Sequence, residues 1–206
     1  MIKVGITGEL GAGKSFISKI FEVLGISVYN SDDRSKKLIS TNHELISKIK
    51  DVFGENIYEG NLYKNLADVV FVDDDKLSLL TSLISPYLIE DINNFYKENS
   101  DEKFCLIESA ILFESELINL VDRVIYVYVP EDIRIERAKL RSNLSEEEYK
   151  NRMKNQMDSV EKIKKSDYII SNYDDFNINE MVYQIFDHLY NRDPEKYTSK
   201  KYLTNY

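Results

Sequence analysis

Three of the seven glycines lie within six residues, in the segment Gly8-Glu9-Leu10-Gly11-Ala12-Gly13-Lys14-Ser15. This segment fits G-x-x-x-x-G-K-[ST], a phosphate-binding loop, and it lies between an apolar run at 2–7 and a helical pattern near 13–24, as the motif requires. Glycines let successive N–H groups turn toward one centre, and the N-terminus of the following helix adds positive charge there. The segment therefore predicts a site for the phosphates of a nucleotide.

The residue types in the loop predict how ATP would be held. Lys14 would reach the β- and γ-phosphates, and the Ser15 hydroxyl would bind Mg²⁺. We expect the nucleotide to be bound by Gly8, Gly11, Ala12, Gly13, Lys14, Ser15 and Phe16. A GTPase would add an N/T-K-x-D element that reads the base, and the sequence has no match to it. A glycine-rich turn without a ligand is the alternative.

Short β-rich runs alternate with longer helical patterns along the chain. Strands are predicted at 2–7, 26–29, 104–108, 123–129 and 167–171, and helices near 13–24, 32–39, 42–52, 74–98, 131–141, 145–157 and 177–190. Strands separated by helices indicate a parallel sheet, and a run that is apolar on both faces, such as 124–129, indicates helices on each side. We expect an α/β, three-layer fold around a five-stranded parallel sheet.

A chain of 206 residues, of which 43 % are apolar, can form one well-packed core. We therefore expect a single domain, 1–206. Residues 40–103 contain no convincing central strand, so they should form a mostly helical, substrate-binding insertion between the second and third strands. Residues 131–157 would form a lid, and residues 191–206 lose apolar periodicity and should fray.

Composition excludes several classes of protein. The net charge of −9 argues against a nucleic-acid or anionic-membrane binder. Neither a signal peptide nor a run of eighteen apolar residues is visible, so we expect a cytoplasmic protein. We also expect it to act on a small molecule and to be a monomer or weak oligomer. The one cysteine, Cys105, lies in an apolar run, where a buried core residue is the favoured interpretation over a catalytic thiol.

Arginines cluster after the fourth predicted strand. Arg134, Arg137 and Arg141 are spaced three and four apart, which aligns them along one helical face. In phosphate-loop kinases such a face belongs to a lid that closes on the transferring phosphoryl group and neutralises its charge. The alternative is a solvated helix whose arginines pair with nearby acids.

Two acids follow predicted strands. Asp32 could accept the proton of an attacking hydroxyl, or Ser31 or Asp32 could cap the helix that begins there. Glu108 could hold the magnesium ion through a water molecule, or it could be a strand-end carboxylate in solvent. The residues alone leave both choices open.

Further segments, in order along the chain, resemble one known family. They read LGISVYNSD (24–32), EGNLYKNLADVVF (59–71), LTSLISPYLIEDI (80–92), IESAILFESEL (107–117), VDRVIYVYVPEDIRIERAKLR (121–141), RMKNQ (152–156) and KKSDYIISN (164–172). Together with the loop they are similar to the dephospho-coenzyme A kinase family, from about residue 2 to residue 172. The resemblance implies a three-layer P-loop kinase fold with a helical substrate subdomain and a lid.

The resemblance also implies site residues. It assigns catalytic roles to Lys14, Asp32, Arg137 and Arg141, and places Asn172 beside the adenine. Substrate binding is expected of Asp32, Pro86 and Glu108, which match the family pattern, and also of Lys36, Lys64 and Arg134, of which Lys64 and Arg134 replace an arginine and a glutamine of that pattern. The metal ligands would be Ser15 and, through water, Glu108. The chain departs from the family pattern at the acceptor side, with Asn30, Tyr63, Ser85 and Ala110 among the exchanged residues.

The activity implied is transfer of the ATP γ-phosphate to the ribose 3′-hydroxyl of dephospho-coenzyme A, with ATP and Mg²⁺ as cofactors. A nucleoside or deoxynucleoside monophosphate kinase on the same scaffold is the alternative, because the acceptor half is altered. A third hypothesis is a nucleotide-binding switch that transfers nothing.

Overall fold

The computed structural model describes residues 1–70, 73–142, 149, 153–154, 156–174 and 176–191, without the side chains of residues 141 and 142. The chain divides into two compact units, one formed by residues 1–29 with 99–206 and the other by residues 30–98. The first unit carries the phosphate-binding loop. The second contains the helices that the sequence predicted for an insertion at 40–103, and it begins at Asn30.

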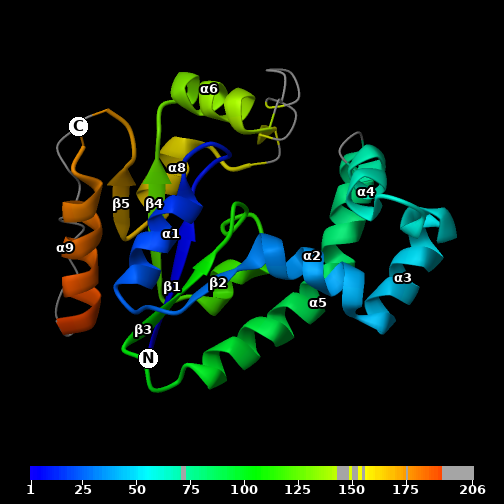
Figure 1. Ribbon diagram of the computed structural model, residues 1–206, viewed down its shortest axis with the longest axis horizontal. Coiled ribbons are helices and arrows are strands. Elements are labelled where there is room, and N and C mark those ends of the chain that lie inside the picture. Colours follow the sequence, from blue (N-terminus) through cyan, green and yellow to red (C-terminus); the bar gives the residue numbers. More distant parts are fainter. Residues whose placement is uncertain (71–72, 143–148, 150–152, 155, 175, 192–206) are drawn as a thin grey trace. The chain divides into compact units, whose positions relative to one another are not determined.

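A five-stranded sheet in the order β2-β3-β1-β4-β5 organises the first unit (Figure 1). Its strands are β1 (Ile2–Thr7), β2 (Val28–Asn30), β3 (Phe104–Glu108), β4 (Arg123–Tyr128) and β5 (Tyr168–Ser171). Strand β1 pairs in parallel with β3 and β4, and β4 pairs in parallel with β5. The predicted strands and α/β class are confirmed. Strand β2 begins later than predicted, because the Ile26 N–H donates to the Phe21 carbonyl in the preceding turn.

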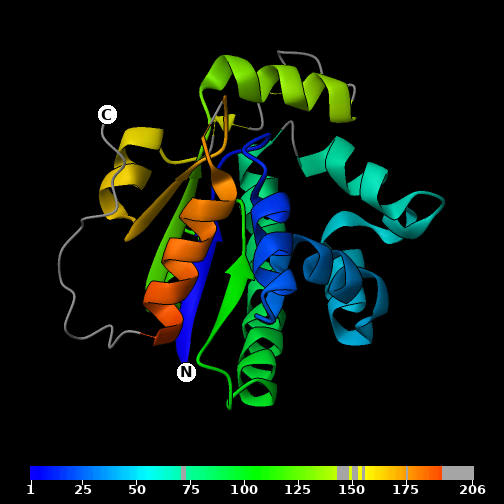
Figure 2. The same ribbon diagram turned by 60° about the vertical axis from the view of Figure 1, so that its left-hand side comes forward.

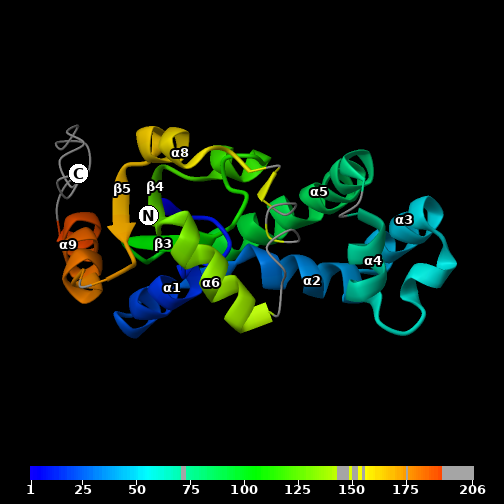
Figure 3. The same ribbon diagram turned by 90° about the horizontal axis from the view of Figure 1, so that it is seen from above.

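Helices cover both faces of this sheet. Helices α1 (Lys14–Val23) and α9 (Ile178–Asn191) contact each other on one face, and α8 (Ser159–Lys165) contacts β4 from the opposite face (Figures 2 and 3). A 3₁₀ turn, η2 (Glu116–Leu120), precedes β4, and helix α6 (Glu131–Ser142) follows β4. This is the three-layer arrangement that the doubly apolar strands predicted.

Alternate residues of the strands form the core on the α1 and α9 face. The buried set comprises Val4, Ile6, Phe104, Leu106, Ile125 and Val127 from strands, Ile17 and Phe21 from α1, and Val182, Ile185 and Leu189 from α9. Cys105, on the other face of β3, is fully buried, as predicted for a core residue. The carboxyl ends of β1 and β3 are therefore fixed by packing where the loop and Glu108 begin.

The second unit is helical in its described residues. Its elements are α2 (Ser31–Thr41), α3 (His43–Phe53), the 3₁₀ turn η1 (Glu55–Tyr58), α4 (Leu62–Val70) and α5 (Asp74–Glu98). They pack around Ile39, Leu45, Ile49, Ile57, Leu66, Val70 and Leu80. An ion pair joins two of these helices, with Arg34 Nε donating to Asp91 Oδ2 at 2.7 Å.

Two short helices, α4 and α8, were absent from the sequence prediction, because nine and seven residues give too few turns for a clear period. Of the helix predicted at 145–157, the structure describes only residues 149, 153–154 and 156–157, and of the tail predicted to fray at 191–206 it describes only residue 191. Among the helices that the structure describes, none is both long and apolar enough to cross a membrane.

Candidate active site

The phosphate-binding loop joins β1 to α1 in a conformation that only its glycines favour. Gly11 has a φ of 86° and Gly13 a φ of 84°, both in the left-handed region. A Cβ atom at Gly11 would lie 2.5 Å from the Arg134 carbonyl oxygen, and one at Gly13 would lie 2.3 Å from Asn172 Nδ2. Glycine is therefore needed both for the turn and for close packing against α6 and the end of β5.

Lys14 and Ser15 begin α1, with Gly13 as the N-cap residue. The Lys14 ammonium donates to the Gly8 carbonyl at 2.8 Å and approaches the Glu9 carbonyl at 3.4 Å, so it lies over the loop. The Ser15 hydroxyl donates to Glu108 Oε1 at 2.6 Å. These contacts gather an ammonium, a hydroxyl and a carboxylate around the start of one helix.

Glu108 is only 5 % exposed, at the end of β3. The alternative of a strand-end carboxylate in solvent is therefore wrong. Its bond to Ser15 places two oxygen donors together, and oxygen atoms are the ligands that Mg²⁺ prefers. Ser15 and Glu108 fit a magnesium ion held by few protein ligands, which commonly keeps several waters and binds substrate phosphates.

Asn172 follows β5 and connects two parts of the site. The side-chain Nδ2 of Asn172 donates to the Ala12 carbonyl at 2.8 Å, and the backbone carbonyl of Asn172 accepts from Arg137 Nη1 at 2.9 Å. The structure thus brings together three of the predicted residues, namely a loop residue, the predicted adenine neighbour and an arginine of α6. Phe16 lies next to the loop on α1 and is 56 % exposed.

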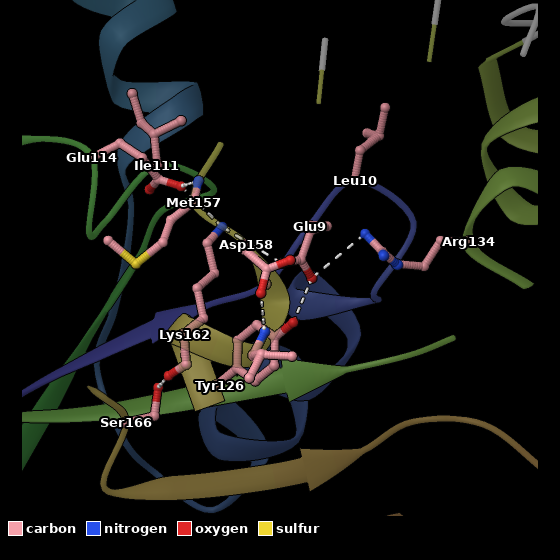
Figure 4. A network of polar contacts seen from close by, with 12 residues as sticks. Glu9, Leu10, Ile111, Glu114, Tyr126, Arg134, Met157, Asp158, Lys162 and Ser166 are labelled. Carbon is pink, nitrogen blue, oxygen red and sulfur yellow. Dashed lines mark hydrogen bonds and ion pairs between the residues drawn. The ribbon is translucent and has the colours of Figure 1, made fainter. Parts of the chain in front are cut away.

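Arg134 is buried beside Glu9 and does not lie on an open cationic face. It is 6 % exposed, and its Nη1 lies 3.6 Å from Glu9 Oε2 (Figure 4). The solvated-helix alternative does not describe Arg134, which is buried, or Arg137, which is partly buried. Arg141 lies in the last turn of α6, and its side chain is outside the part of the chain that the structure describes.

Three residues around the loop escaped sequence reasoning. Glu9 is 2 % exposed, accepts a 2.8 Å hydrogen bond from the Tyr126 hydroxyl, and lies 3.6 Å from the buried Lys162 ammonium. Glu9 is a variable position of the loop motif, Tyr126 lies in a strand, and Lys162 lies on α8 outside the motifs, so motif spacing assigns none of them a role. The one available signal was an acid inside a loop that otherwise carries small and apolar residues before Lys14.

Four of the predicted substrate-binding residues, Asp32, Lys36, Lys64 and Pro86, lie in the second unit. Asp32 is exposed in the first turn of α2. Asn30 is the N-cap residue of this helix, and its side chain accepts a hydrogen bond from the Asp33 N–H at 3.0 Å. The alternative in which Ser31 or Asp32 caps the helix is wrong. Lys36 pairs with Asp33 at 3.3 Å on the same helix.

The other two acceptor-side residues are also exposed, and each lies on its own helix. Lys64 is near the start of α4, and Pro86 lies within α5.

This geometry defines a P-loop nucleotide-binding protein, because a parallel strand, a glycine loop ending in Lys-Ser and a following helix are the elements with which such proteins hold phosphates. The model of the dephospho-CoA kinase family matches residues 2–177. The chain therefore belongs to the dephospho-CoA kinase family.

Individual relatives agree with the family match. The dephospho-CoA kinase of Bacteroides fragilis strain YCH46 is 36 % identical over 177 residues, which cover 83 % of this chain and 84 % of the relative. That of Aquifex aeolicus is 34 % identical over 175 residues, covering 84 % of this chain and 89 % of the relative. The structure is similar to dephospho-CoA kinase from Campylobacter jejuni, with a TM-score of 0.60, 25 % identity, and coverage of 91 % and 97 % of the two chains.

Proposed function

We propose that this protein transfers the γ-phosphate of ATP to the ribose 3′-hydroxyl of dephospho-CoA, giving CoA and ADP. The observation that carries the proposal is the phosphate-binding loop with its Ser15–Glu108 contact, in a chain of the dephospho-CoA kinase family. The O3′ atom forms the new bond to phosphorus, the bond from phosphorus to the ADP oxygen breaks, and the hydroxyl proton leaves to a base.

The loop residues provide the binding part of this mechanism. Backbone N–H groups of the loop and the N-terminus of α1 bind the phosphates, and Lys14 neutralises the charge that develops on the transferring group. We propose that Ser15 and Glu108 hold Mg²⁺, Glu108 through water. When bound, the ion supplies further neutralisation of the phosphate oxygens.

The remaining catalytic roles fall to Asp32 and the arginines of α6. We propose that Asp32 accepts the hydroxyl proton, which is supported by the match to the family pattern and by Asn30 already filling the role of helix cap. Arg137, fixed by its bond to the Asn172 carbonyl, would neutralise transferred charge together with Arg141. Lys36, Lys64 and Pro86 are proposed to bind the acceptor.

The test is a comparison of acceptors. Purified protein is given ATP, Mg²⁺ and, separately, dephospho-CoA, AMP, dAMP and other nucleoside monophosphates, and kcat/KM is measured for each by ADP release. The proposal predicts a preference for dephospho-CoA of several orders of magnitude, because discrimination of this size needs satisfied hydrogen bonds in the acceptor site. A higher kcat/KM with a nucleoside monophosphate would overturn it.

A further inference from the structure

Glu9 places a carboxylate inside the phosphate-binding loop, where bound phosphates would be close to a negative charge. The side chain is 2 % exposed and points beneath the loop (Figure 4). The Tyr126 hydroxyl, from β4, donates to Glu9 Oε2 at 2.8 Å. Burial, and then the charge of Glu9, raise the pKa of the Tyr126 phenol, so that it stays a proton donor to Glu9.

Two buried cations face Glu9 from different helices. Arg134 of α6 lies 3.6 Å from Glu9 Oε2, and Lys162 of α8 lies 3.6 Å from Glu9 Oε1. Their side chains are 7 % and 0 % exposed. Water is therefore largely excluded, and the interactions are screened much less than those of surface pairs.

Lys162 has a second acidic partner. Its ammonium lies 3.0 Å from Glu114 Oε1, closer than it lies to Glu9. Glu114 Oε1 is fixed in turn by the Met157 N–H, at 2.6 Å. Lys162 and Glu114 therefore offset each other, which leaves Arg134 as the cation that balances Glu9.

This balance bears on the loop because the backbone of Glu9 is part of it. The loop binds anions through N–H dipoles and one ammonium, so an uncompensated carboxylate beneath it would repel the same phosphates. The α6 backbone also touches the loop, since a Cβ at Gly11 would meet the Arg134 carbonyl at 2.5 Å. Arg134 thus contacts the loop through both its backbone and its side chain.

We propose that Glu9 and Arg134 form a charge pair that positions the phosphate-binding loop, and that Arg134 supports ATP binding by neutralising Glu9, without contacting the phosphates. This rests on the proposed function in one respect, since it takes ATP to be the ligand of the loop. Arg134 is then a positioning residue, in place of the substrate contact that the sequence predicted.

A double-variant comparison separates this from direct phosphate contact. The dissociation constant of ATP is measured by calorimetry for the full-length wild type, Arg134→Gln, Glu9→Gln and the double variant Glu9→Gln with Arg134→Gln. Arg134→Gln should weaken ATP binding about tenfold, and the double variant should return to within about threefold of wild type, because the carboxylate that needed Arg134 is gone. Direct contact predicts that the double variant binds as weakly as Arg134→Gln, which would overturn the proposal.

The matched control is Lys164→Gln, which removes one positive charge from an exposed position of α8, where Lys164 pairs with Glu161. Its ATP affinity should equal that of the wild type. If Arg134→Gln fails to fold because it leaves a buried carboxylate unpaired, the double variant still decides: near-wild-type ATP binding supports the proposal, and loss of binding contradicts it. If dephospho-CoA is not phosphorylated, the proposed acceptor is refuted. The ATP affinities of these variants would still test the charge pair of Glu9 and Arg134.

Discussion

Glu108 shows how one side chain depends on two strands. It ends β3, and the parallel register with β1 places it opposite Ile6, just before the loop. Its hydrogen bond to Ser15 then joins two residues that are 93 positions apart in the chain. A carboxylate in this position can orient the hydroxyl and any metal ion that the hydroxyl binds.

Replacing Glu108 by Gln should lower kcat about 10- to 100-fold and raise the Mg²⁺ concentration that gives half-maximal rate, because a support for the ion is lost. Steady-state rates across a magnesium titration measure both effects. Glu116→Gln is the control, since Glu116 is an exposed acid in η2. An unchanged magnesium dependence in Glu108→Gln would remove Glu108 from the metal site.

Asp32 and Asp33 are adjacent, exposed acids on α2, and only Asp32 is proposed to accept a proton. Asp32→Asn should lower kcat by about 10²- to 10⁴-fold with little change in ATP affinity, because a general base acts on the chemical step. Asp33→Asn should keep most of the activity. Single-turnover rates and ATP dissociation constants are the readouts, and equal losses in the two variants would contradict the assignment.

At this scale the sequence predicted the residues whose spacing is fixed by the backbone, such as Lys14 and Ser15. It missed Glu9 and Lys162, because their roles come from contacts between the loop and α8, which are distant in the chain. Helical spacing aligned Arg134 with Arg137 and Arg141 but did not predict that Arg134 is buried, since spacing places side chains along a face and does not say whether that face is covered.

Among the elements, the loop and α6 depend on each other. Gly11 and Gly25 have almost the same φ, 86° and 87°, but of the two only Gly11 has a neighbour that an added Cβ atom would meet. Long elements with clear periods, such as α1 and α9, were predicted within two residues. The short helices α4 and α8 were missed. A helix of so few turns is stabilised mainly by tertiary packing and only weakly by its local sequence.

The two glycines give a matched pair of variants. Gly25→Ala should cost about 1–2 kcal/mol of unfolding free energy through backbone strain alone. Gly11→Ala should lower the unfolding free energy by more than Gly25→Ala does, and should also weaken ATP binding, because its Cβ would displace the Arg134 backbone. Urea unfolding and ATP calorimetry measure the two quantities, and equal behaviour of both variants would show that the loop does not need its contact with α6.

Across the whole molecule, stability should depend on alkaline pH through buried groups. Burial raises the pKa of the Cys105 thiol to about 12 from an ordinary value of 9.0. The unfolded chain therefore loses this proton first as pH rises, so the stabilisation is complete below pH 9 and is lost between about pH 9 and 12. Tyr126, whose pKa is also raised, acts in the same direction.

The unfolding free energy should therefore fall above pH 9, by at most about 1.4 kcal/mol per pH unit for each such group. The unfolding free energy of Cys105→Ala should fall less steeply over the same pH range. The stability that this variant loses through poorer packing is measured separately at pH 7. Urea unfolding at pH 8 to 11 provides the comparison. Parallel curves for the two proteins would show that the thiol does not titrate with folding.

The position of the transferred phosphate distinguishes the proposed reaction from its alternatives. Wild-type protein is incubated with ATP, Mg²⁺ and dephospho-CoA, and the product is examined by phosphorus NMR and by mass. We predict one ADP for each acceptor molecule and a single new phosphomonoester on the ribose 3′-oxygen. Formation of ADP without a phosphorylated acceptor, or a product extended as a diphosphate, would contradict the assignment.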